Sequence, residues 1–503
     1  MSAKVKVLQL GETDLSGQYE ISTEADWYYE PDLSETEISM FEVVILGRCI
    51  RSREREQLFW LTKAWCLFVT DTFEPDEDTQ WLMRSKCGQV LDGDRLRIFL
   101  KEEIPDYYGS PYGEKYSPGN IAITDGIRGK VQWDGFMGPV ITADFGKEFR
   151  QVAYWRNNIP VFQNQSIDFW LEYEKSGTVE IQLKITQFRA GSVSTVQNNW
   201  EFSEEELRDV VYITNRKKEG PIFVSLMAKG EGQLKIIALH DRYSRRGKGA
   251  FLPGGRRLVT SKREEIFFYF DPGDRKPPLN VYFSGYKTLE GFEGYNMMRR
   301  MGAPFLLVSE ARLEGGAFYI GSAEYEQMMI GGIQSYLDEL QFTPEQMIFS
   351  GLSMGTFGAL YYGCDFKPFA IFAGKPLASI GDVADNERIH RPGGFPTSLD
   401  VLLKHYGSLD AYAVEKANLC FWKKFDATEW EDTRFVIAYM IEDDYDPTAY
   451  PTLISHIRDD SIEIYSKGLH GRHNDNTAGI VKWFVNQYNN VLHTYFTREF
   501  GED

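Results

Sequence analysis

The second half of the chain alternates between short, mostly apolar runs and segments with helical periodicity. The apolar runs predict buried strands at residues 279–284, 305–308, 346–350, 369–372, 435–439 and 462–465. Between the second and third runs, Tyr325, Met329 and Ile333 recur on one face of a predicted helix, although Gly331 and Gly332 interrupt the pattern. Buried strands that alternate with helices are typical of a parallel sheet, so residues 266–503 are predicted to form an α/β domain.

Two regions with other patterns precede this domain. Residues 1–114 predict a small N-terminal α/β unit, because short strand candidates stop there at turn residues. Its strand candidates are residues 5–11, 41–47 and 66–71. Residues 115–265 instead carry short runs of alternating polarity, which predict a β-sandwich.

The predicted sandwich holds four tryptophans, Trp133, Trp155, Trp170 and Trp200. Large aromatic side chains usually fill a core, and that is the favoured interpretation. Exposed tryptophans would instead stack on sugar rings, so the region is also a candidate glycan-binding module that resembles carbohydrate-binding modules.

The most specific motif follows the predicted strand at residues 346–350. Gly351-Leu352-Ser353-Met354-Gly355 has the G-x-S-x-G spacing of a nucleophile elbow, and a helical segment comes next. The glycines remove side chains that would clash in so tight a turn. The context predicts Ser353 as the nucleophile of an α/β-hydrolase-like catalytic domain. The backbone N–H of Met354 and the positive end of the helix would stabilise an oxyanion.

A serine hydroxyl needs a general base, and the chain has only seven His residues. His470 and His473 lie in the loop between the last predicted strand and the last predicted helix, where the base of a Ser-acid-His triad is expected. His473 is closer to the helix and is the preferred base, with His470 as the alternative.

An acidic loop follows the predicted strand at residues 435–439. Its approach to Pro447 resembles the acid loops of esterases and favours Asp443 as the triad acid, with Glu442 as the alternative. A second oxyanion donor is expected in the loop after residues 279–284, from the backbone N–H of Gly285 or Tyr286.

Composition argues against several other classes of protein. A net charge of −19 is unfavourable for a broad nucleic-acid surface, so no nucleic-acid partner is expected. The five Cys residues form no CxxC pair, which supports neither a disulfide framework nor a zinc site, and no metal site is predicted. No signal peptide is recognisable, and no apolar run approaches the ~20 residues that span a bilayer. A soluble, cytosolic protein is expected, with peripheral membrane contact left open.

A basic run stands out on this acidic chain. Eight Lys and Arg residues lie between Arg242 and Arg263. Such a run is usually a solvated loop, which is the favoured interpretation. Contact with acidic partners or anionic lipid headgroups is the alternative.

These motifs together resemble the family of second accessory secretory proteins of the accessory Sec system. The resemblance rests on the elbow from Gly351 to Gly363, the acid loop, Gly471-Arg472-His473-Asn474-Asp475, and the start from Lys4 to Gly11. It covers the whole chain. It implies a cytoplasmic protein that acts with the first and third accessory secretory proteins, near the accessory Sec motor ATPase and the membrane channel. Its role would be the export of glycosylated serine-rich repeat adhesins.

The resemblance also implies O-acetyltransferase activity on N-acetylglucosamine of the adhesin glycan. Ser353 and His473 carry over as nucleophile and base, and because the family's acid can be a Glu, Glu442 stays beside Asp443. No cofactor is expected to be bound, but an acetyl donor is required. Acetyl-CoA is one candidate, although no motif for its recognition is evident. A carbohydrate or acetyl esterase, or a non-catalytic secretion scaffold with a hydrolase fold, are the alternatives.

Overall fold

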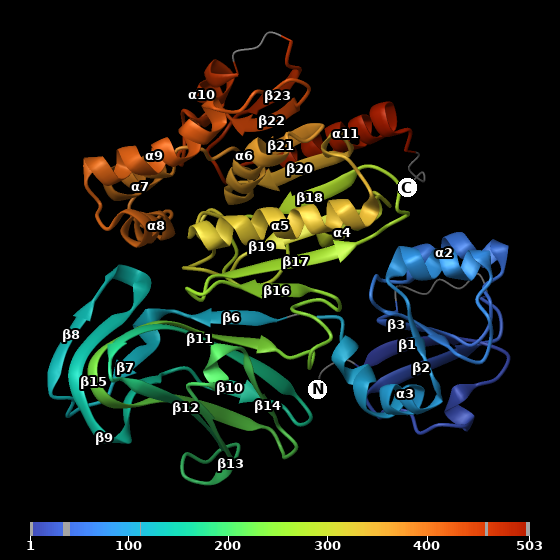
Figure 1. Ribbon diagram of the computed structural model, residues 1–503, viewed down its shortest axis with the longest axis horizontal. Coiled ribbons are helices and arrows are strands. Elements are labelled where there is room, and N and C mark those ends of the chain that lie inside the picture. Colours follow the sequence, from blue (N-terminus) through green and yellow to red (C-terminus); the bar gives the residue numbers. More distant parts are fainter. Residues whose placement is uncertain (1–3, 34–40, 111, 458–460, 499–503) are drawn as a thin grey trace.

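The computed structural model describes residues 4–33, 41–110, 112–457 and 461–498. Its strands form three sheets, which correspond to the three lobes of Figure 1. The first sheet lies in the blue lobe, the second in the teal and green lobe, and the third in the yellow to red lobe.

The first sheet is parallel and lies within the region predicted as an N-terminal α/β unit. Its strand order is β2-β1-β3-β4-β5. The strands are β1 (Val5–Leu10), β2 (Ala25–Glu30), β3 (Val43–Leu46), β4 (Leu67–Thr70) and β5 (Gln89–Leu91), and the helices are α1 (Arg55–Leu61), α2 (Glu77–Lys86) and α3 (Gly93–Ile98). Sequence patterning missed β2 and β5 because these edge strands are only partly buried and lack a continuous apolar run.

The second sheet is antiparallel, as the alternating polarity predicts. It differs from a sandwich of two separate sheets, because the long strands β9 and β15 join ten strands into one continuous sheet around a shared core. Its strands are β6 (Gly113–Tyr116), β7 (Ile121–Ile123), β8 (Gly129–Trp133), β9 (Pro139–Trp155), β10 (Ile159–Val161), β11 (Ser166–Gly177), β12 (Glu180–Phe188), β13 (Val196–Ser203), β14 (Val211–Thr214) and β15 (Gly220–Tyr243). Register shifts in β9 and β15 mark the places where these strands bend.

The tryptophans of this region divide between core and surface. Trp155 and Trp170 are buried, and Trp200 packs partly against the core. Trp133, on β8, is 51% exposed and is therefore the tryptophan with a ring face open to solvent. The predicted core role is thus confirmed for three of the four.

The third sheet has the mostly parallel strands that the alternation of apolar runs and helical segments predicts. Its strand order is β16-β17-β19-β18-β20-β21-β22-β23, and the six strands from β19 to β23 along this order are parallel. The strands are β16 (Arg256–Val259), β17 (Glu265–Asp271), β18 (Leu279–Phe283), β19 (Phe305–Ser309), β20 (Met347–Leu352), β21 (Ala370–Gly374), β22 (Arg434–Met440) and β23 (Ile464–Leu469). The antiparallel strands β16 and β17 extend the sheet at the edge nearest the second sheet (Figure 1).

Helices cover both faces of the third sheet. They are α4 (Tyr295–Arg300), α5 (Ala323–Leu340), α6 (Met354–Phe366), α7 (Ile380–Ile389), α8 (Thr397–Tyr406), α9 (Ala411–Asp426), α10 (Ala449–His456) and α11 (Thr477–Phe496). One core lies under α5, α6 and α9, and a second lies under α4 and α11. The helix over residues 323–340 is continuous although Gly331 and Gly332 lie within it, because burial of its apolar face outweighs their low helix propensity.

This topology makes the chain diverge at the carboxyl ends of two neighbouring strands. Strand β18 lies between β19 and β20, and the chain leaves β18 towards α4 on one face but leaves β20 towards α6 on the other. Loops that diverge to opposite faces of a parallel sheet open a binding site between them. The predicted nucleophile follows β20, so the fold places it at this point.

The basic run between Arg242 and Arg263 is not the solvated loop that its composition favours. Arg245 is buried and donates hydrogen bonds to three backbone carbonyl oxygens, those of Phe251, Asp106 and Tyr108. Lys248 forms an ion pair with Glu103 at 2.8 Å, and Arg246 pairs with Asp106 at 2.7 Å. These cations therefore connect parts of the chain to one another, because carbonyl groups and carboxylates from the first lobe face them.

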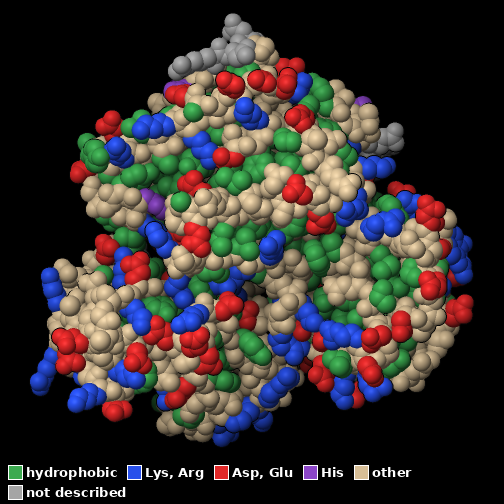
Figure 2. All heavy atoms as spheres, viewed as in Figure 1, with side chains coloured by type: hydrophobic (Ala, Val, Ile, Leu, Met, Phe, Trp, Pro, Cys, Tyr) green, Lys and Arg blue, Asp and Glu red, His purple; other side chains and the backbone are tan. Residues whose placement is uncertain are grey.

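Over the face shown in Figure 2, Lys and Arg side chains are interspersed with Asp and Glu. Acidic and basic side chains are therefore mixed on this face, although the whole chain has a net negative charge. Within the described ranges, no helix combines the length and the apolar character needed to cross a bilayer.

Candidate active site

Ser353 occupies a strained turn between β20 and α6. Its φ of 52° and ψ of −124° lie outside the regions that ordinary residues adopt. The turn is closely packed, since a Cβ on Gly351 would lie 2.3 Å from the carbonyl oxygen of Gly355, and one on Gly355 would lie 2.1 Å from that of Phe283. Glycine is therefore required at both positions, and the turn holds the Ser353 hydroxyl at the carboxyl end of β20.

The structure brings Ser353, His473 and Asp443 together from three loops. The Ser353 Oγ lies 2.8 Å from Nε2 of His473, and Nδ1 of His473 lies 2.8 Å from Oδ2 of Asp443. These loops follow β20, β23 and β22. The three residues are separated from one another by 30 to 120 positions in the chain. A hydroxyl, an imidazole and a carboxylate in this order can pass a proton from the nucleophile to the ring.

The surroundings of His473 favour its neutral form. The imidazole is buried, and burial lowers the pKa of His473 below its usual value, while the hydrogen bond to Asp443 opposes that shift. A neutral imidazole can accept the proton of Ser353. The backbone N–H of His473 donates to Oδ1 of Asp444 at 3.0 Å, which fixes the loop that carries the ring.

The alternative acid and base form a separate pair on the surface. Glu442 Oε1 lies 3.0 Å from Nδ1 of His470, and the two side chains are 51% and 85% exposed. The neighbouring residues Glu442 and Asp443 thus face different histidines. The geometry places Asp443 and His473 at Ser353, while Glu442 accepts hydrogen bonds from His470 and from the backbone N–H of Gly471.

The oxyanion side of the site distinguishes between the two predicted candidates for the second donor, Gly285 and Tyr286. The loop from Ser284 to Gly291, here called the oxyanion loop, begins against the elbow, because a Cβ on Gly285 would lie 2.9 Å from the carbonyl oxygen of Leu352. However, the N–H of Gly285 donates to Oε2 of Glu293 at 2.6 Å and is not free for a substrate. The N–H of Tyr286, the other candidate, has no partner among the described residues.

The N–H of Met354 is the first of helix α6. No N–H at the first turn of a helix has a partner within that helix, so this group can donate to an oxyanion. Met354 and Tyr286 therefore replace Met354 and Gly285 as the pair of donors that the structure leaves available.

An aromatic wall beside His473 was missed by sequence analysis. The ring of Tyr445 lies 4.3 Å from that of His473 and stacks on Phe395 at 5.6 Å, and Tyr286 packs against Phe395 at 5.5 Å. Arg391 covers the outer face of Tyr445 at 3.8 Å and pairs with Asp444 at 2.7 Å. In the sequence, the segment after α7 that carries Phe395 is rich in Gly and Pro. This composition predicts a loop but does not show that the loop lies beside His473.

Asp446, also in the acid loop, binds the backbone of the segment that follows β21. Its carboxylate is buried and accepts hydrogen bonds from the N–H groups of Ala378 and Ser379, at 3.0 and 2.9 Å. Burial raises the pKa of Asp446 to about 6. The four carboxylates of this loop thus have four different sets of partners, which their sequence does not distinguish.

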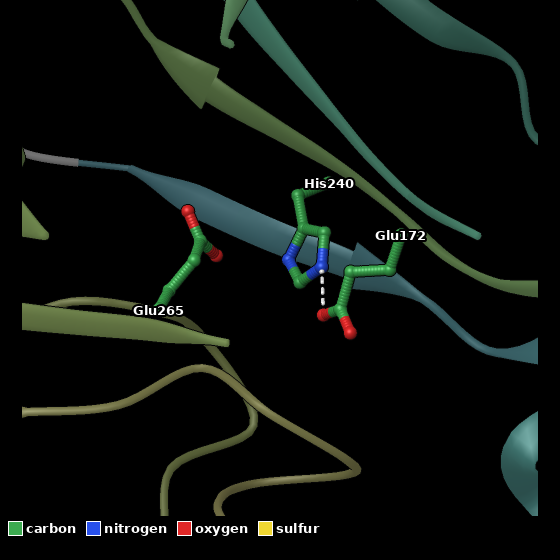
Figure 3. A group of neighbouring side chains, drawn as sticks. All are labelled: Glu172, His240 and Glu265. Carbon is green, nitrogen blue, oxygen red and sulfur yellow. Dashed lines mark hydrogen bonds and ion pairs between the residues drawn. The ribbon is translucent and has the colours of Figure 1, made fainter. Parts of the chain in front are cut away.

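One set of side chains within the described ranges is close enough to hold a metal ion. It consists of Glu172, His240 and Glu265, all buried between the second and third sheets (Figure 3). The set is already neutralised by protein cations, since both terminal nitrogens of Arg242 donate to Glu265 at 2.7 Å and His240 Nε2 lies 2.8 Å from Glu172. A metal ion would have to displace Arg242, so the residues fit an ion-pair network better than a metal site.

Comparisons with known proteins confirm the resemblance over the full chain. Residues 5–498 match the family model described as accessory Sec system GspB-transporter, the family of second accessory secretory proteins. The accessory Sec system protein of this family from Streptococcus gordonii is 36% identical over 99% of this chain and 100% of its own length. Its counterpart in Staphylococcus aureus is 37% identical, over 99% and 98%.

A solved structure shares the whole architecture. It is the Glycosylation Associate Protein (Gap123) complex from Streptococcus agalactiae, with a TM-score of 0.88 and 34% identity. The match covers 99% of this chain and 100% of that chain, so all three sheets have counterparts there.

Proposed function

Since the chain belongs to the GspB-transporter family of second accessory secretory proteins, we propose that it is a serine-dependent O-acetyltransferase that also serves export of a glycosylated adhesin. The observation that carries the enzymatic part is the hydrogen-bonded series Ser353–His473–Asp443, which has a buried imidazole at its centre. The N–H groups of Met354 and Tyr286 have no partner among the described residues. The acceptor, N-acetylglucosamine on a serine-rich repeat adhesin, comes from the family resemblance. A cytoplasmic location beside the accessory motor ATPase belongs to the same proposal.

The first half-reaction forms an acetyl-enzyme. His473 takes the proton of Ser353 as Oγ attacks the carbonyl carbon of the acetyl donor. The resulting oxyanion accepts hydrogen bonds from the N–H groups of Met354 and Tyr286, and His473, now protonated, is stabilised by Asp443. The tetrahedral intermediate then collapses, and the donor's leaving group departs with the proton from His473.

The second half-reaction transfers the acetyl group to the sugar. A sugar hydroxyl gives its proton to His473 and attacks the acetyl carbon, and Ser353 leaves as the regenerated hydroxyl. Transfer outcompetes hydrolysis only if the sugar is held in place and water is kept out. Within this wall, the ring of Tyr286 is 39% exposed and can pack on a sugar, while the stacked rings of Phe395 and Tyr445 help to exclude water.

The test is mass spectrometry of the adhesin glycan from cells that carry the wild-type protein or Ser353→Ala, with export scored in the same cultures. We expect acetyl groups to disappear in the variant. Unchanged acetylation would rule out Ser353 as the nucleophile. To separate transferase from esterase, the purified protein is given an acetyl ester with and without glycan, and acetyl-glycan is measured against free acetate.

A role in export that does not need the chemistry is the second candidate. It is favoured by the similarity over the full chain to a component of a complex of associated proteins. We propose that this chain binds the first and third accessory secretory proteins. Co-purification of these partners with Ser353→Ala, together with normal export, is the expected result. Loss of both in a folded variant would mean that the catalytic site and the scaffold are not separable.

A further inference from the structure

The oxyanion loop is held at both of its ends by different parts of the molecule. At its start, Gly285 lies against the nucleophile elbow. At its other end, the N–H of Glu290 donates to the carbonyl oxygen of Gly113 at 2.8 Å, and Leu289 forms a β-bridge with Glu114. Gly113 and Glu114 belong to β6 of the second sheet. A loop of the catalytic region therefore pairs with a strand of another sheet, four residues from Tyr286.

The side chain of Glu290 strengthens this attachment. Its carboxylate binds Nδ1 of His240 through Oε1 and Nε of Arg242 through Oε2, the latter at 2.5 Å. His240 and Arg242 are on β15, and all three side chains are buried. Burial alone would raise the pKa of Glu290, but Arg242 and His240 lower it to about 2. The carboxylate is thus charged and bound to two cations of the second sheet.

The two cations are themselves fixed in place. His240 Nε2 lies 2.8 Å from Glu172 on β11 (Figure 3). Arg242 binds Glu265 on β17 with two hydrogen bonds. Burial alone would lower the pKa of His240, but Glu290 and Glu172 raise it above its usual value. Each ring nitrogen lies within hydrogen-bond distance of a carboxylate, so the orientation of the imidazole is determined from both sides.

The space behind the loop is nearly filled. Lys115 of β6 and loop residues that include Gly285, Lys287 and Glu290 line a cavity of about 10 Å³, room for about one water molecule. Displacement of the loop towards the second sheet is thus limited by packing, and displacement away from it is opposed by the Glu290 ion pairs.

On the basis of the function proposed above, we propose that His240 and Arg242 are positioning residues, which hold Glu290 so that the N–H of Tyr286 is presented to the oxyanion formed at Ser353. The second sheet then contributes to acyl transfer without touching the substrate. The N–H of Tyr286 has no partner among the described residues, and its ring packs against Phe395. The direction of this N–H is therefore set by the ring contact together with the attachment of the loop at its two ends.

Two matched variants test this. Glu290→Gln and Glu172→Gln each remove one carboxylate from the same imidazole, but only Glu290 is in the oxyanion loop. The assay is the pre-steady-state burst of 4-nitrophenol from 4-nitrophenyl acetate, which reports acetylation of Ser353. Thermal unfolding of each variant confirms that it is folded.

We expect Glu290→Gln to lower the acylation rate constant by 10- to 100-fold with KM changed less than about 2-fold, since full loss of an oxyanion donor costs about 10²–10³ in rate. Glu172→Gln should lie within 3-fold of wild type, and Glu290→Asp should recover part of the rate. Normal acylation by Glu290→Gln, or an equal loss in both Gln variants, would overturn the positioning role.

A second measurement separates this inference from the proposed function. Hydrogen exchange, read by mass spectrometry over peptides that contain residues 284–291, should be faster in Glu290→Gln than in wild type and unchanged in Glu172→Gln. If wild-type protein shows no burst that depends on Ser353, the acyl-transfer proposal fails, whereas the exchange result still decides whether Glu290 holds the loop. Unchanged exchange in Glu290→Gln would refute that attachment.

Discussion

Replacement of Asp443 by asparagine should abolish most acyl transfer while leaving the protein folded. The reason lies in the two oxygens of this carboxylate. Oδ1 accepts the backbone N–H groups of Tyr445 and Asp446, at 2.9 and 3.2 Å, and Oδ2 faces Nδ1 of His473 at 2.8 Å. The amide oxygen of asparagine has to take the place of Oδ1, so its NH₂ group would point at the imidazole.

An NH₂ group at Nδ1 forces the wrong tautomer on His473. Nδ1 would then accept a hydrogen bond, and Nε2 would carry the proton and could no longer receive that of Ser353. The same change in a Ser-His-Asp triad lowers kcat by about 10⁴-fold. At ~1.36 kcal/mol per factor of ten, this corresponds to about 5.4 kcal/mol of transition-state stabilisation.

The assay is steady-state release of 4-nitrophenol from 4-nitrophenyl acetate, with circular dichroism and thermal unfolding as controls for the fold. Glu442→Gln is the matched variant, because it removes the neighbouring carboxylate from the exposed His470. We expect it to retain activity within about 3-fold, as exposed ion pairs contribute little. A larger loss in Glu442→Gln than in Asp443→Asn would refute the assignment of the acid.

Three further outcomes follow from burial and packing. Because burial lowers the pKa of His473 and the base must be neutral, kcat/KM should rise with pH through a midpoint below its usual ~6.5, and a midpoint above 7 would contradict this. In urea unfolding, Gly331→Ala should stabilise the protein by about 0.5–1 kcal/mol, since nothing lies within 4 Å of the new Cβ. Gly332→Ala should destabilise the protein, because that Cβ would lie 2.5 Å from the ring of Phe268. Equal changes in the free energy of unfolding for Gly331→Ala and Gly332→Ala would count against the packing of α5. Arg245→Met should lower the free energy of unfolding by about 3 kcal/mol or more in the same measurement, because three carbonyl groups lose a charged donor. An unchanged free energy of unfolding would show that the basic run does not hold the first lobe in place.

Signals confined to neighbouring residues predicted much of the fold. Continuous apolar runs located the parallel strands of the third sheet, and alternating polarity located the antiparallel second sheet. The elbow at Ser353 was recognisable because its glycines, strand and helix are contiguous in the chain. The edge strands β2 and β5 were missed, since half-exposed strands need no continuous apolar pattern.

The sequence by itself predicted many of the segments that form strands and helices, that Ser353 follows a strand, and that two candidate bases follow another strand. These depend on local propensity and periodicity, which act over a few residues. Only the tertiary structure decided that Asp443 rather than Glu442 faces His473, and that the N–H of Tyr286, unlike that of Gly285, has no partner among the described residues. It also decided that cations of the basic run bind groups of the first lobe. These outcomes depend on partners that lie from 8 residues away, for Gly285 and Glu293, to 139 residues away, for Arg245 and Asp106, and adjacent side chains in a loop can point in opposite directions.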